Sequence, residues 1–191
     1  MFEHVTVLLS FVFALALTHL LSSATELMAA RDRLRFSGRL ALWMVNAVVG
    51  LLVNWLGFWG LSAVKRWTVG EIILQFGAAV IQYFTCSLAS MRVTAGETVD
   101  MTAFFERQRR PIMLAFLAMM VASMVQNYVD RDHTVGLAST DWIFENLIIL
   151  PMGVATLLAG WARPVWLQWG AGAALLGAEV FFLVTYAVPA A

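Results

Sequence analysis

The chain has 191 residues, of which 61% are hydrophobic and 13% are charged. A soluble domain carries about 25% charged residues, so this composition excludes a water-soluble fold and predicts an all-α protein that lies in a lipid bilayer. The net charge is zero, which gives no basic surface for nucleic acid, and the single cysteine, Cys86, excludes both a disulfide within the chain and a CxxC motif.

Six apolar stretches are long enough to cross a bilayer core of about 30 Å, which needs about 20 residues per helix. The first stretch has no basic region before it, so we expect a retained helix and not a cleaved signal peptide. The connecting loops are too short for a soluble domain. We therefore predict one transmembrane domain over residues 1–191, a polytopic bundle of six helices. The six stretches cover roughly 5–28, 40–62, 71–91, 111–129, 142–160 and 166–187.

The first span carries polar residues on one face, from His19 through Ser22 and Ser23 to Glu26. Glu26 lies near the end of the span and close to Arg31, which predicts an interfacial ion pair. His19 lies deeper in the span. It is either a neutral histidine bonded to a neighbouring helix or part of a polar route through the bundle.

Small and polar side chains recur at helical spacing in the second, third and sixth spans. In a membrane, such stripes mark the faces that pack on other helices. We expect the amides, Asn54 and Gln82 among them, to join helices; the alternative is that they line a substrate or ion path. The stripes are Asn46, Gly50, Asn54 and Gly57; Gln75, Ala79, Gln82 and Cys86; and Gly170, Ala174 and Ala178.

The loop 92–110 contains an amphipathic segment. Asp100 is an N-cap residue type, and an aromatic pair and a basic run follow it before Pro111. We predict a short helix at the membrane interface, with its phenylalanines in the acyl chains and its arginines at anionic headgroups. The simpler alternative is a basic anchor without a recognition role. The predicted interface residues are Phe104, Phe105, Arg107, Arg109 and Arg110.

Two carboxylates lie in the last two spans. Glu145 lies about one turn inside the fifth span, where the helix dipole favours a carboxylate, and Pro151 should kink that helix. Glu179 lies well inside the sixth span, where a charge costs at least a few kcal/mol, so it should be protonated, paired or facing water. If the first and sixth spans are neighbours, His19 and Glu179 can share a contact or a water bridge.

The basic residues favour one side of the membrane. Loops 30–39, 92–110 and 161–165 hold nine of the twelve cations, and the other side holds Lys65, Arg66 and Arg131. Because positively charged loops stay in the cytoplasm, we predict that both termini are non-cytoplasmic.

Several chemistries are excluded by residue type. The only lysine, Lys65, lies in a loop, which excludes a retinal Schiff base in the bundle. His4 and His133 lie outside the spans, which disfavours a bis-histidine haem. The chain has no HExxH, GxSxG or P-loop motif. We expect no enzymatic activity, no metal and no cofactor.

A basic first loop, residues 33–36, precedes a second span with Trp43 and Trp55, and the stretch 99–110 carries an aromatic pair followed by two adjacent arginines. In these features the chain resembles uncharacterised proteobacterial multi-pass membrane proteins. The resemblance implies the bacterial inner membrane and supplies no activity. The first span is also similar to that of six-helix potassium channels, but their R-x-x-x-F-S-D signature is absent.

Three functions stay open; a membrane enzyme is the least favoured, and the other two are as follows. One is a small permease or channel with a polar route near His19 and Glu179, which predicts a water-accessible path to Glu179. The other is a non-catalytic accessory or scaffold subunit of a larger membrane complex, which predicts no such path. The expected partners are the lipid bilayer and either a homo-oligomer or a larger complex.

Overall fold

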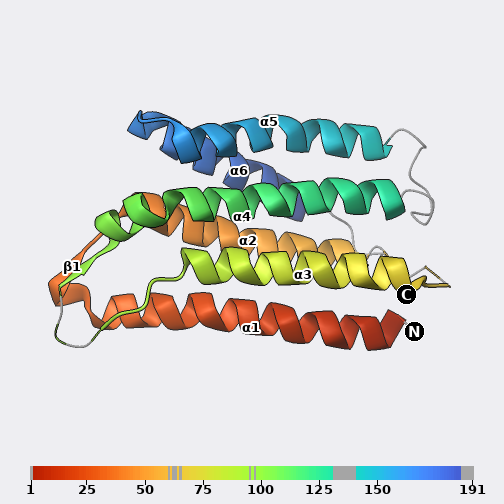
Figure 1. Cartoon of the computed structure of the whole chain (residues 1–191), viewed down its shortest axis with the longest axis horizontal. Helices are drawn as coiled ribbons and strands as arrows, with labels where there is room; N and C mark the ends of the chain where they lie inside the picture. The colour runs from red at the N-terminus through yellow and green to blue at the C-terminus, as the bar shows by residue number, and fades with distance from the viewer. Residues whose placement is uncertain are drawn as a thin grey trace.

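The structure is a computed structural model that describes residues 2–59, 61, 64, 66–94, 96, 98–130 and 141–185, without the side chains of residues 141, 142, 144 and 145. It is all-α, and its helices lie side by side along one direction (Figure 1). The helices are α1 (Phe2–Ala29), α2 (Gly38–Trp59), α3 (Val69–Ala89), α4 (Met101–Asp130), α5 (Asp141–Trp161) and α6 (Val165–Thr185).

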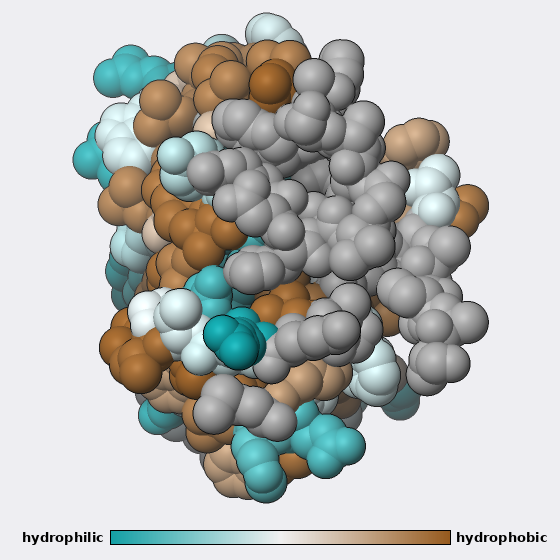
Figure 2. All heavy atoms as spheres, turned by 90° about the vertical axis from the view of Figure 1, so that its right-hand side faces the viewer, coloured by the Kyte–Doolittle hydropathy of each residue, from teal (hydrophilic) through white to brown (hydrophobic). Residues whose placement is uncertain are grey.

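Five of the helices, α1 to α4 and α6, are long and apolar enough to cross a membrane by length and composition. The apolar part of α5 in the described residues, Asn146–Trp161, is shorter. Large apolar side chains lie on the outside of the bundle, Phe11, Phe84 and Phe181 among them, and brown apolar side chains reach the rim of the face in Figure 2. The architecture therefore fits the predicted all-α membrane protein, and the crossing of the membrane by all six helices stays a prediction.

The helix contacts close a ring in the order α1, α3, α4, α5, α6 and α2. In Figure 1, α1, α3, α4 and α5 form the front row, and α2 and α6 lie behind it. The second helix also contacts α3 and α4, so it is the most central element. In this ring α2 lies between α1 and α6, because α6 packs mainly on α2 and α5.

A short parallel strand pair joins two loops at one end of the bundle. Strand β1 (Leu34–Arg35) follows the 3-10 turn η1 (Arg31–Arg33), and it pairs with β2 (Val99–Asp100), which precedes α4. The connection between α1 and α2 is thereby fixed to the connection between α3 and α4 (Figure 1). We call this the β end of the bundle; the connection between α5 and α6 lies there too.

The prediction of a separate interfacial helix before Pro111 is wrong. Asp100 does cap a helix, because its Oδ1 accepts the N–H of Ala103 at 2.9 Å, but that helix is α4, which continues through Pro111 to Asp130. Pro111 is exposed, so the carbonyl that loses its helical donor lies on the outer side, where other partners can reach it. Likewise, α5 runs on through Pro151 as one helix.

Two of the three predicted packing stripes face other helices. In α3 the whole stripe is buried, and in α2 all but Gly57 lie against a neighbour. The stripe predicted for α6 is wrong, because Gly170 and Ala174 are exposed. The small residue that α6 turns toward α2 is Gly172, where a Cβ would lie 2.7 Å from Leu42 Cδ2. Small residues occur on both faces of α6, so their spacing alone does not select the packed face.

Candidate functional site

The interface between α2 and α6 carries a row of polar contacts inside the bundle. At the β end, Arg39 Nη1 donates to Gln168 Oε1 at 2.5 Å. Further along, Asn46 Nδ2 donates to the carbonyl of Gly172 at 3.1 Å. We call this row, completed by Gly50 and Glu179, the α2–α6 seam. It begins at the first turn of both helices, which run in the same direction (Figure 1).

Glu179 forms the far end of the seam. Its side chain lies against Gly50, where a Cβ would meet Glu179 Oε1 at 2.8 Å. The carboxyl group therefore occupies space that only a glycine leaves open. From Arg39 to Gly50 the seam rises eleven residues along α2. At 1.5 Å per residue this is about 16 Å, roughly half of a bilayer core.

Each step of the seam has a buried polar atom without a hydrogen-bond partner among the described residues. These atoms are Gln168 Nε2, Asn46 Oδ1 and Glu179 Oε2. The indole N–H of Trp43 also lacks an acceptor there, and its ring carbon Cε2 lies 3.5 Å from a Cβ built on Gly172. A buried polar group without a partner costs about 1–3 kcal/mol, and more when it is charged. The seam thus has donors and acceptors available for a proton, a cation or water.

The predicted amides Asn54 and Gln82 meet on the other side of α2. Asn54 Nδ2 donates to Gln82 Oε1 at 3.0 Å and to the carbonyl of Gly50 at 2.9 Å. Gln82 Nε2 in turn donates to the carbonyl of Ala47 at 3.1 Å. The expectation that these amides join helices is confirmed for α2 and α3. Through Gly50 the pair also adjoins the Glu179 end of the seam.

His19 lies at a different interface. Its Nε2 and the hydroxyl of Tyr83 on α3 are 2.9 Å apart, and the two rings meet edge to face. Since α1 packs mainly on α3, and α6 on α2 and α5, the structure places His19 and Glu179 at separate interfaces. Glu26 accepts the N–H of Val93 at 3.1 Å. The side chain of Glu145 lies outside the described residues.

A second polar cluster joins α3, α4 and α5 at the opposite end from the β end. Gln75 Nε2 donates to Asp130 Oδ2 at 2.9 Å, and Gln126 donates to Gln75 Oε1. Asn127 donates to Asn146 Oδ1 at 3.1 Å. Sequence reasoning missed this cluster. Its signal was the amide pair at 126 and 127, near the end of an otherwise apolar span.

At the β end, two of the basic residues are engaged inside the protein: Arg39 joins α2 to α4 through Glu106, and Arg109 on α4 donates to the carbonyl of Ala162 after α5 at 3.4 Å. Arg39 and Arg109 both approach Glu106, at 2.6 Å and 3.7 Å, and their side chains are 13% and 14% exposed. Arg39 also lies over the ring of Phe105, which is fully buried. The prediction that Phe105 enters the acyl chains and that Arg109 meets headgroups is therefore wrong. Burying Phe105 under Arg39 packs the start of α4 onto α2.

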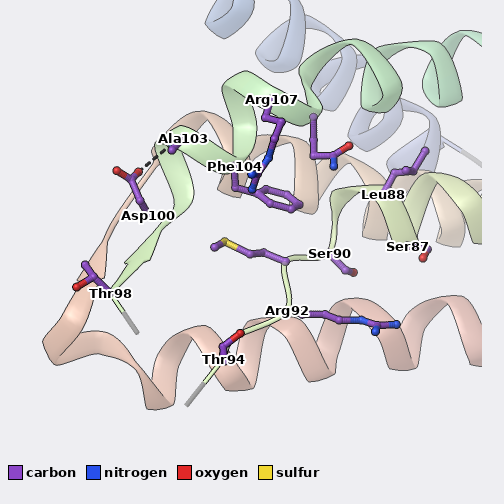
Figure 3. A pocket seen from close by; sticks show the side chains of 12 residues that line it. Ser87, Leu88, Ser90, Arg92, Thr94, Thr98, Asp100, Ala103, Phe104 and Arg107 are labelled. Atoms are coloured by element: carbon purple, nitrogen blue, oxygen red, sulfur yellow. Dashed lines mark hydrogen bonds between the residues drawn. The ribbon is translucent and has the colours of Figure 1, made fainter. Parts of the chain in front are cut away.

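Two of the other predicted interface residues, Phe104 and Arg107, line an open recess of about 550 Å³ at the same end (Figure 3). Phe104 and Arg107 reach it from the first turns of α4, and Ser90 and Arg92 from the segment after α3. Arg110 is exposed on α4.

Asp100 lies at the edge of this recess as an ionised group. The N–H of Ala103 and the guanidinium of Arg35, 3.1 Å away, lower the pKa of its carboxyl.

Searches against protein-family models, curated proteins and solved structures give no match for this chain. The fold and the seam define it as an all-α protein of membrane-crossing composition with a polar interface in its interior. Among the described residues, no group of three or more His, Cys, Asp or Glu side chains could hold a metal ion. A single carboxyl group such as that of Glu179 can bind and release a proton.

Proposed function

We propose that this protein is a small, non-enzymatic permease or channel of the bacterial inner membrane, with both termini on the non-cytoplasmic side. The α2–α6 seam is its polar route, and Glu179 is the group on that route that binds and releases a proton. The observation that carries the proposal is the Glu179 carboxyl against Gly50, with a buried oxygen that finds no donor in the described part of the chain.

The cost of burying polar groups supports this function. Ionisable side chains inside a membrane are expensive, and in transport proteins they mark proton relays and ion pathways. A carboxyl group with a purely structural role is expected to have both oxygens bonded, as nearly all buried polar groups do. Along the α2–α6 seam, buried polar atoms without a hydrogen-bond partner among the described residues recur over about 16 Å, from Gln168 to Glu179. Waters that bridge them would connect Glu179 to the β end.

Proton flux into reconstituted vesicles tests the proposal. Vesicles that hold a pH-sensitive dye receive an inward proton gradient, with valinomycin and potassium to remove the opposing potential. We expect the wild-type protein to acidify the interior. Glu179→Gln keeps the side-chain size beside Gly50 and removes the exchangeable proton, so it should lower the flux to that of protein-free vesicles.

The matched control is Glu3→Gln, which changes an exposed carboxyl in the first turn of α1 and should leave the flux unchanged. Circular dichroism and gel filtration of each variant establish that the fold is intact. If the wild-type protein carries no flux of protons, alkali cations or small anions, the permease proposal fails. The accessory or scaffold role then takes its place.

A further inference from the structure

The recess at the β end lies at the level where the apolar helices stop. Its walls are the end of α3, the segment that follows, the strand β2 and the first turns of α4 (Figure 3). The third helix ends at Ala89 and α4 begins at Met101, so the recess lies beside the boundary between apolar spans and polar loops. In a bilayer this boundary is the headgroup region.

Two guanidinium groups line the recess without a partner among the residues that the structure describes. Arg92 and Arg107 are exposed, and no hydrogen bond or ion pair engages either of them within the described ranges. Other arginines at this end are engaged: Arg35 by Asp100, and Arg39 by Glu106. The described lining carboxylate, Asp100, is thus already neutralised by Arg35, and the described lining residues keep a net positive charge.

The remaining lining groups suit an amphipathic ligand. Hydroxyl groups of Ser87 and Thr98 can donate to ester or phosphate oxygens, and Phe104 supplies an apolar wall. Phe84, which is 55% exposed, and Leu88 share one face of α3 with Ser87. This face leads from the recess along α3 toward the bilayer core, which is the path that an acyl chain would take.

We propose that the recess binds the headgroup of an anionic phospholipid. The phosphate is drawn to the recess by Arg107 beside Phe104 and by Arg92 on the opposite wall (Figure 3). The glycerol and headgroup hydroxyls lie near Ser87 and Thr98, and an acyl chain follows the Phe84 face of α3. The inference is independent of whether the α2–α6 seam conducts protons. It replaces the predicted interfacial helix with a defined binding site at the same end of α4.

Native mass spectrometry in detergent tests the site, with phosphatidylglycerol and phosphatidylcholine as probes at equal concentration. We expect the wild-type protein to retain phosphatidylglycerol in preference to phosphatidylcholine. Each arginine near an anionic headgroup contributes about fivefold in affinity, so Arg92→Gln with Arg107→Gln should lower the affinity by about 25-fold. The matched control is Arg110→Gln with Arg163→Gln, which removes the same charge from exposed positions that do not line the recess.

A variant that keeps every charge separates the recess from general surface attraction. Ala103→Phe adds bulk to an exposed lining position on α4, so it should fill the recess and also weaken phosphatidylglycerol binding. The proposal is overturned if the control pair loses as much affinity as the lining pair, or if Ala103→Phe binds like the wild type. Displacement of the lipid by millimolar glycerol 3-phosphate would overturn the lipid assignment and indicate a soluble phosphate ester.

Discussion

Replacing Gly50 by alanine probes the seam most directly. Ordinary contact begins at 3.4 Å, and the new methyl group would lie 2.8 Å from Glu179 Oε1, so the carboxyl must move by about 0.6 Å. Overpacking of this kind destabilises the fold by about 1–3 kcal/mol, while replacing a glycine within a helix by alanine stabilises it by about 0.5–1 kcal/mol. We expect a net loss of about 0–2.5 kcal/mol in the free energy of unfolding, measured in mixed micelles with increasing sodium dodecyl sulfate.

The effect of Gly50→Ala on the free energy of unfolding should change sign when the Glu179 carboxyl is absent. In a Glu179→Ala background the clash is gone, so Gly50→Ala should stabilise the protein by about 0.5–1 kcal/mol. Gly57→Ala, on the same helix with nothing within 4 Å of its added Cβ, should stabilise both backgrounds equally. If Gly50→Ala costs the same free energy with and without Glu179, the two residues do not touch and the geometry of the seam is wrong.

Three further predictions concern the β end and the topology. Glu106→Gln leaves two largely buried arginines without their carboxylate, so the free energy of unfolding should fall by about 1–3 kcal/mol in the same micelle titration. The lowered pKa of Asp100 means that its cap stabilises α4 above the ordinary carboxyl pKa of about 4 and is lost as the pH falls through the lower folded value. The protection of the Ala103 amide, its exchange rate compared with the intrinsic rate at the same pH, should therefore fall on acidification, and in Asp100→Asn this pH dependence should disappear. Finally, in a background without the native cysteine, an impermeant maleimide added outside whole cells should label Gly70→Cys and leave Asp32→Cys unlabelled; the reverse pattern would overturn the topology.

The polar stripes could be predicted from the sequence because helical spacing fixes which residues share a face. Asn54 and Gln82 were assigned to helix contacts on that basis, and they bond to each other. The partner of each face could not be predicted. Lipid tails are as apolar as the helix surfaces, so nothing in the sequence of α1 indicates that it packs on α3 and not on α6. For this reason His19 and Glu179, which look alike in sequence as isolated ionisable groups, lie at separate interfaces.

The arginines show a second limit of sequence reasoning. The cation count that predicts the topology treats every basic residue in a loop alike. In the structure, Arg39 of α2 pairs with Glu106 of α4, and Arg109 donates to the carbonyl of Ala162 after α5. Arg92 and Arg107 reach an open recess instead. What separates them is the packing of α4 on α2, since Glu106 lies 67 positions after Arg39 in the sequence. Spacing along the chain carries no information about a contact of that separation.

The pairing of β1 with β2 has a mechanical consequence. It fastens the hairpin of α1 and α2 to the hairpin of α3 and α4 at one end, with the ion pair between Arg35 and Asp100 as a second fastening. Both links lie in the loops, outside the apolar spans, so their strength does not depend on the thickness of the bilayer. A thinner or thicker membrane changes the tilt of the helices that cross it. In this protein the loops at the fastened end would keep their spacing, and a change of tilt would separate the helices most at the opposite end, where α1 begins.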